Sequence, residues 1–175
     1  MTPSPPQVVT PLTDFARLYR EHAADVHRFA LYLSGNPSLA EDLASEAFVR
    51  AWTARERVEL ATVRGYLFAI VRNLFLQHLR HQRRRAPLDE RILDDRPDPE
   101  ARASDQSSLQ AVLAALHALP EVDRAAVLMR ADGELSYEEI AAALRISVAA
   151  AKVKVHRARL RLAEALGARG PGGGL

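Results

Sequence analysis

Apolar residues recur at three- and four-residue steps through the first half of the chain. Over residues 15–33 they fall on one face of a helix, and Gly35-Asn36-Pro37 interrupts that spacing. Apolar pairs repeat every four residues over 39–52 and predict a second helix with a wide buried stripe. A third pattern starts near Thr62 and leads into a cluster of arginines. Three amphipathic helices in succession predict a helical bundle.

The pattern stops after the arginine cluster. Residues 86–108 contain three prolines among many acids and few apolar side chains, a composition that cannot bury enough surface to offset the entropy of ordering. We expect a flexible acidic linker there. With no strand-like alternation and no internal repeat, the predicted fold class is all-α, two small helical domains joined by that linker. The predicted divisions are a disordered N-terminus 1–11, a first domain 12–85, the linker 86–108, a second domain 109–166 and a disordered tail 167–175.

The most specific local signal lies in the second domain. Ser136 and Glu139 have the spacing of a capping box, in which each side chain bonds the other residue's backbone amide, and they predict a helix start at Tyr137. After a short turn at Arg145-Ile146, Ser147 is a second expected N-cap. Two short helices separated by a tight turn predict a helix-turn-helix.

The distribution of charge indicates what the predicted helix-turn-helix binds. The net charge is only +2, but residues 60–88 and 140–163 contain no acid and several cations. Clustered cations on the exposed face of a second helix suit the major groove of DNA, and clustering matters more than the total charge when the partner is a polyanion.

Several kinds of chemistry are not expected. The chain has no cysteine, which removes disulfides, thiolate metal sites and cysteine nucleophiles. His78 and His81 have a metal-compatible spacing, but neighbouring arginines would repel a cation and no acid lies near. No phosphate-binding loop or nucleophile elbow is present. We therefore expect no enzyme activity, metal, cofactor or small-molecule substrate. We also expect no membrane insertion, because no apolar run is long enough to span a bilayer.

Two segments carry a family resemblance. Residues 135–141 (Leu-Ser-Tyr-Glu-Glu-Ile-Ala) and 153–159 (Val-Lys-Val-His-Arg-Ala-Arg) resemble region 4 of the sigma factors of the extracytoplasmic-function (ECF) type, in the sigma-70 family. Residues 40–52 are similar to the polymerase-contacting helix of their region 2, and the segment from Arg64 through Asn73 to the arginine cluster is similar to the helix that follows it. The chain departs from the family at Arg145, where a glycine is usual, and a non-glycine residue with positive φ costs on the order of 1 kcal/mol.

The resemblance implies a division of labour. Core RNA polymerase (clamp and flap regions) and promoter DNA would be the partners, an anti-sigma factor the expected regulator, and the cytoplasm the place of action. The implied polymerase-binding residues are Glu41, Asp42, Ser45 and Glu46. The residues implied for the minus-10 element are Arg55, Arg57, Arg64, Arg72, Arg80, Arg83 and Arg84. Those implied for the minus-35 element are Lys152, Lys154, His156, Arg157 and Arg159.

Two other functions remain open from the residues alone. A helix-turn-helix regulator that binds DNA as a dimer, independently of polymerase, would explain the second domain but leaves the first without a role. A sigma mimic that titrates an anti-sigma factor would not need the clustered arginines.

Overall fold

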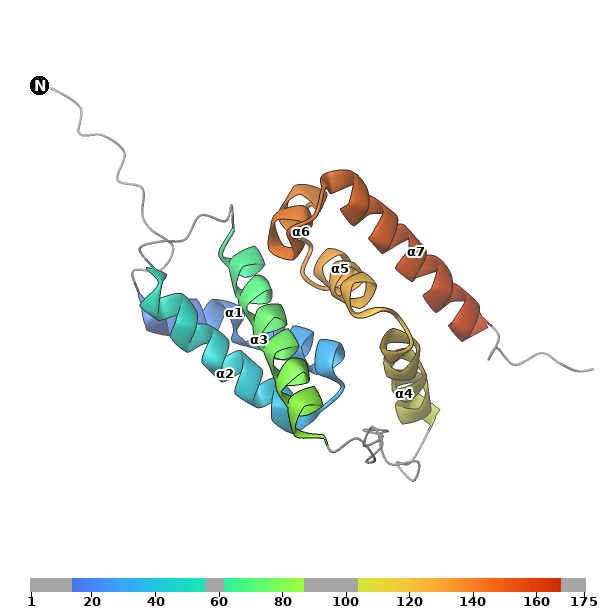
Figure 1. The fold of residues 1–175 in the computed structure, drawn as a ribbon, viewed down its shortest axis with the longest axis horizontal. Coiled ribbons are helices and arrows are strands. Elements are labelled where there is room, and N and C mark those ends of the chain that lie inside the picture. Colours follow the sequence, from blue (N-terminus) through green and yellow to red (C-terminus); the bar gives the residue numbers. More distant parts are fainter. Residues whose placement is uncertain (1–13, 56–61, 87–103, 168–175) are drawn as a thin grey trace, which may run out of the picture.

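The structure is a computed structural model, which describes residues 14–55, 62–86 and 104–167. All regular elements in these ranges are α-helices (Figure 1). They are α1 (Phe15–Ser34), α2 (Pro37–Thr53), α3 (Val63–Arg85), α4 (Ser104–His117), α5 (Glu121–Ala131), α6 (Tyr137–Leu144) and α7 (Val148–Gly167). The all-α prediction is confirmed.

The first bundle consists of α1, α2 and α3, and local sequence sets the ends of its helices. Gly35 ends α1 with φ 68°, and the Asn36 side chain accepts a hydrogen bond from the backbone of Leu39 to start α2. Thr62 caps α3 in the same way. Between α1 and α3, the rings of Phe29 and Phe68 stack with centroids 4.3 Å apart in the core.

The second bundle consists of α4 to α7. The capping box predicted at Ser136 and Glu139 is present at the start of α6, and the hydroxyl of Ser147 accepts from the amide of Ala150 at the start of α7. Arg145, in the turn, adopts φ 56° and ψ 47°, which is the left-handed conformation. The expected helix-turn-helix therefore forms, and it keeps a glycine-like backbone at an arginine.

One boundary prediction was wrong. Helix α4 begins at Ser104, inside the expected linker 86–108. Serine and aspartate stop an apolar pattern, but they are also favoured at helix starts, so composition alone placed the boundary too late. Of the tail predicted to be disordered, Gly167 is the last residue of α7. The rest of that tail, the predicted N-terminal segment 1–11 and most of the linker lie outside the described residues.

The two bundles pack against each other in the structure, where α4 and α5 contact α1, and α5 and α6 contact α3. The seven successive residues 123–129 of α5 are all buried, so this helix is covered on every side. Beyond its end, Gly133 lies against the ring of Phe68 with no room for a side chain. One hydrophobic core consequently runs through both bundles.

Arg124 ties the end of the first bundle to the second. Its side chain is almost fully buried and donates to the carbonyl of Leu33, at the C-terminal end of α1, at 2.6 Å. It also donates to the carbonyls of His117 and Leu119, beside the end of α4, at 3.5 and 3.3 Å. Carbonyls at helix C-termini have no partner within the helix and carry partial negative charge, so a buried guanidinium suits them.

Candidate functional site

The first candidate surface is the outer face of α2. The four residues expected to bind polymerase, Glu41, Asp42, Ser45 and Glu46, are all exposed there, as a helical repeat of three to four residues requires. Within the described part of the chain, Glu46 forms an ion pair with Arg50, one turn further along, at 2.9 Å. The four side chains therefore share one accessible face of α2.

Aromatic residues that the sequence reasoning did not select extend this face. Between α1 and α2 is an open hollow of about 340 Å³, whose lining includes Tyr19, His27, Glu41, Ser45 and Phe48. The side chain of Tyr19 is 50% exposed and its ring lies 5.0 Å from that of Phe48. A half-exposed aromatic side chain is typical of protein interfaces, where tyrosine, tryptophan and phenylalanine are enriched.

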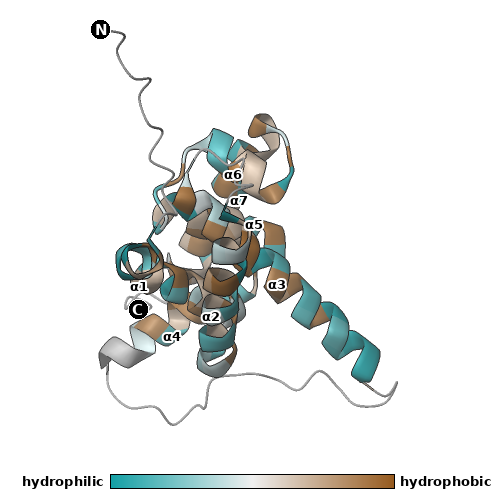
Figure 2. Cartoon of the chain, turned by 90° about the vertical axis from the view of Figure 1, so that its left-hand side faces the viewer, coloured by the Kyte–Doolittle hydropathy of each residue, from teal (hydrophilic) through white to brown (hydrophobic). Residues whose placement is uncertain are grey.

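The second candidate surface is the C-terminal end of α3. Arg80, Arg83 and Arg84 are exposed there, and this end of the helix projects from the body of the protein as a hydrophilic segment (Figure 2). The structure thus brings three of the arginines expected at the minus-10 element onto one projecting helix end.

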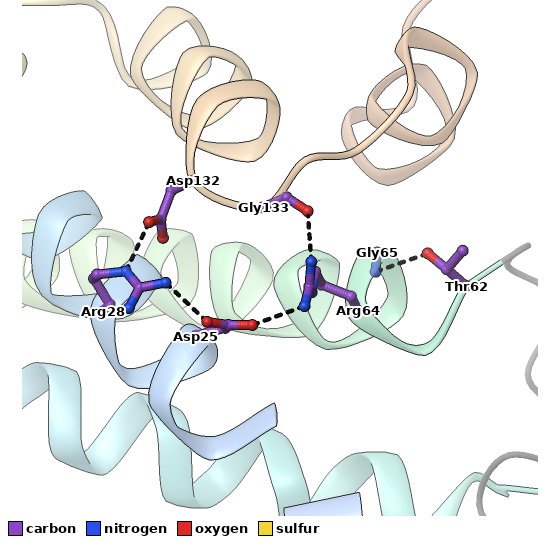
Figure 3. Close-up of polar contacts among 7 residues, drawn as sticks. All are labelled: Asp25, Arg28, Thr62, Arg64, Gly65, Asp132 and Gly133. Carbon is purple, nitrogen blue, oxygen red and sulfur yellow. Dashed lines mark hydrogen bonds and ion pairs between the residues drawn. The ribbon is translucent and has the colours of Figure 1, made fainter. Parts of the chain in front are cut away.

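Arg64 belongs to the same predicted set but lies elsewhere. It donates to Asp25 of α1 at 2.9 Å and to the carbonyl of Gly133 at 3.2 Å, and Thr62 caps the start of its helix (Figure 3). The carboxylate of Asp25 also accepts a hydrogen bond from Arg28, and Arg28 donates a second one to Asp132 at 2.7 Å. Arg64 is therefore part of an alternating chain of charges between the bundles.

Arg72 is held in a similar way. Its guanidinium donates to both carboxylate oxygens of Glu121, at 2.7 and 2.9 Å, across the junction of the bundles. Arg55 lies over the ring of Trp52 and donates to its backbone carbonyl, while Arg57 lies outside the described residues. The structure does not bring all the arginines predicted for the minus-10 element onto one surface.

The third candidate surface is the exposed side of α7. Lys152, His156 and Arg159 are exposed, as predicted, while Lys154 is half-buried. Val153 lies among them with 58% of its surface exposed. Sequence reasoning passed over Val153, although an exposed apolar residue within a cationic face can contact the methyl group of thymine.

Arg157 is the most constrained cation of α7. Its Nε and Nη2 donate to the two oxygens of Asp123, at 2.7 and 3.0 Å, and Nζ of Lys154 lies 3.6 Å from the same carboxylate. Asp123 is fully buried. The hydrogen bond from Arg157 holds the pKa of Asp123 below its ordinary value, against the opposing effect of burial. The only sequence signal for Asp123 is a carboxylate within a run that is otherwise largely apolar.

Within the described ranges there is no group of three or more histidines, cysteines or carboxylates that could hold a metal ion. No helix in those ranges is long and apolar enough to cross a membrane.

Comparison with known proteins matches both halves of the chain, in order. Residues 18–85 match the Sigma-70 region 2 family and residues 109–162 match Sigma-70, region 4. The chain is 37% identical to the ECF RNA polymerase sigma factor SigE of Mycolicibacterium smegmatis over 85% of its own length and 60% of that protein's. It is 30% identical to the ECF RNA polymerase sigma factor SigM of Bacillus subtilis over 83% of its length and 90% of that protein's.

A solved structure agrees with these sequences. The sigma factor RpoE of Bartonella quintana, in complex with the anti-sigma factor NepR, superimposes with a TM-score of 0.71 at 26% identity, over 90% of this chain and 99% of that one. The chain belongs to the sigma-70 family of RNA polymerase sigma factors, as a member of the ECF type. A regulator that works without polymerase is not favoured, because it would leave the matched region 2 without a role.

Proposed function

We propose that this protein binds core RNA polymerase through the outer face of α2 and recruits it to promoters whose upstream element is read by α7. The observation that carries this proposal is the pairing of regions 2 and 4 in one chain, with both of these faces exposed. The protein acts by binding alone, in the cytoplasm where polymerase works. Glu41, Asp42, Ser45 and Glu46 would contact the polymerase clamp.

The two DNA-facing surfaces have different tasks. Arg80, Arg83 and Arg84 on the projecting end of α3 would hold phosphates near the minus-10 element, a contact that positions the protein without reading sequence. Lys152, Val153 and His156 share one exposed side of α7 and would approach base edges of the minus-35 element. Arg159 lies at the border of that side and would bind phosphates, as would Lys154, which is half-buried beside Asp123.

An anti-sigma factor is a further proposed partner. The similar RpoE structure contains the anti-sigma factor NepR. The hollow between α1 and α2, with Tyr19 at its rim, is an accessible surface on which an apolar side chain of such a partner could rest.

Transcription in vitro tests the proposed function. Core polymerase, with and without the protein, is given a pool of genomic promoter fragments, and new transcripts are mapped. We expect protein-dependent transcripts whose promoters share paired upstream elements. If the protein neither binds polymerase nor starts transcripts, yet shifts DNA alone, the polymerase-independent regulator becomes the better account.

Two double variants separate the proposed surfaces. Asp42→Lys with Glu46→Lys should weaken binding to core polymerase by roughly tenfold or more, because like charges at an interface cost several kcal/mol. Glu164→Lys, on the exposed end of α7, is the matched control and should bind polymerase normally. Lys152→Ala with His156→Ala should leave polymerase binding intact but remove transcripts that depend on the upstream element.

A further inference from the structure

Asp123 is a carboxylate in the core that has no direct route to DNA. It is fully buried on α5, and its two oxygens are turned to Arg157 and Lys154 of the helix proposed to read the promoter. A buried ion pair is weak support for stability, because a well-packed apolar pair of similar volume often serves as well or better. Stability alone therefore does not explain a carboxylate at this position. The geometry of its pair with Arg157 explains it better.

The geometry concerns which edge of the arginine is used. Asp123 takes the Nε and Nη2 edge of the Arg157 guanidinium, as a bidentate partner. The opposite, end-on edge, formed by Nη1 and the second hydrogen of Nη2, is left over, and 45% of the side chain is exposed. That edge carries the two parallel donors that match O6 and N7 of guanine.

The position of Arg157 on α7 supports the same role. Val153, His156 and Arg157 are related by steps of three and four residues, so they share one exposed side of the helix. Arg157 lies at the border of that side nearest to α5, which is where a carboxylate from α5 can reach it. An arginine without such a partner samples many rotamers, and restricting it to one of them when it binds DNA costs conformational entropy.

We propose that Asp123 is a positioning residue, which fixes the guanidinium of Arg157 so that its free edge reads a guanine of the promoter. The inference rests on the proposed function of α7 and deepens it, since it names the base class that one side chain selects. Asp123 itself touches no DNA. Its effect should therefore appear at one base pair and nowhere else.

The test is a selection with the assembled holoenzyme. Polymerase carrying the protein is given duplex DNA randomised across the upstream promoter region, and bound duplexes are sequenced. The unmodified protein should prefer guanine about tenfold or more at a position that Arg157 contacts. Arg157→Lys keeps the positive charge beside Asp123 but loses the planar fork, and should abolish that preference alone.

Asp123→Asn is the decisive variant. It retains the shape of the side chain but removes the charge, and it should lower the guanine preference about two- to tenfold at the same position while leaving the others unchanged. Arg161→Gln, an exposed cation further along α7, is the control and should weaken all sequences alike.

Three results would overturn the inference. They are a uniform loss of preference at every position in Asp123→Asn, an unchanged preference in that variant, and retention of the guanine in Arg157→Lys. Should Asp123→Asn fail to fold, Arg157→Lys still decides whether Arg157 reads the guanine, and Asp123→Glu should then displace the fork and weaken the preference. A holoenzyme of the unmodified protein that selects no upstream sequence would instead remove the proposed function, and this inference with it.

Discussion

Arg72 of α3 and Glu121 of α5 form a two-pronged ion pair that joins region 2 to region 4. Nε and Nη2 of the arginine lie 2.7 and 2.9 Å from the two carboxylate oxygens, and the side chains are only 12% and 20% exposed. Such a pair is screened less by salt than a surface pair, because little solvent lies around it.

Removing one partner of this pair should destabilise the folded protein. Arg72→Gln or Glu121→Gln leaves a mostly buried charge without its partner, at a cost of roughly 1–3 kcal/mol. The double variant should lose less than the sum of the two single losses, because it leaves no lone charge. Urea unfolding of the four proteins measures this coupling. Additive losses would mean that the two residues do not interact in solution.

Gly35 should not tolerate alanine. Its φ of 68° is costly for other residues, on the order of 1 kcal/mol, and a Cβ there would overlap the imidazole of His117 on α4. We expect Gly35→Ala to lower the melting temperature by several degrees. Gly167→Ala, where nothing lies near the added methyl, is the matched control and should melt normally. In the double variant Gly35→Ala with His117→Ala, the melting temperature should recover only the part of its decrease that comes from overlap between the added Cβ and the imidazole.

Arg145 should be improved by glycine. An arginine at φ 56° carries a left-handed penalty that glycine does not, so Arg145→Gly should stabilise the protein by about 0.5–1 kcal/mol, even after the added freedom of the unfolded chain. Ala142→Gly, at an exposed position within α6, is the opposite control and should cost about 1 kcal/mol. Thermal unfolding compares them. A loss of stability in Arg145→Gly would show that its side chain makes a stabilising contact.

His22 should make the protein sensitive to mild acid. Burial, and secondarily the charge of Arg64, lower the pKa of its imidazole, against weaker opposing effects of Glu21 and Asp25. The unfolded chain then binds a proton more readily than the folded one, so stability falls as pH drops below about 6.5, the ordinary value for histidine. The loss is complete once pH is below the pKa of the folded state.

The variant His22→Asn isolates this effect. It removes the titrating group, so the free energy of unfolding should change less between about pH 7.5 and 5.5 than in the unmodified protein. Urea unfolding at the two pH values measures the difference, and proton NMR follows His22 directly. An imidazole that titrates at or above its ordinary value would contradict the prediction.

Much of the local structure could be predicted from sequence, because its causes are local. The spacing of Ser136 and Glu139 predicts the start of α6. Gly35 followed by Asn36-Pro37 predicts the end of one helix, α1, and the start of the next, α2. The exposure of the α2 acids and of Lys152 follows from helical periodicity alone.

Long-range partners could not be predicted in this way. The sequence around Arg64 and Arg72, residues 60–88, contains no acid, so both look like unpaired cations. Their partners, Asp25 for Arg64 and Glu121 for Arg72, come from distant parts of the chain. Trp52 ends the apolar pattern of residues 39–52, which predicts a buried stripe, yet it is only half-buried and packs edge-on against Phe15 with ring centroids 5.5 Å apart. Asp123 is the clearest case, since its importance comes from a helix that begins well after it in the chain.

The ion pairs of Arg64 and Arg72 have a consequence for how tightly DNA can be held. A phosphate that binds Arg64 or Arg72 must first displace Asp25 or Glu121, so the number of charge pairs does not rise, and the gain has to come from counterions that leave the DNA. The displaced carboxylate is tethered within the same molecule, at a high effective concentration. The carboxylate therefore competes with DNA phosphates for the arginine from within the same molecule. Dilution does not weaken this competition, which is the same at every concentration of the protein.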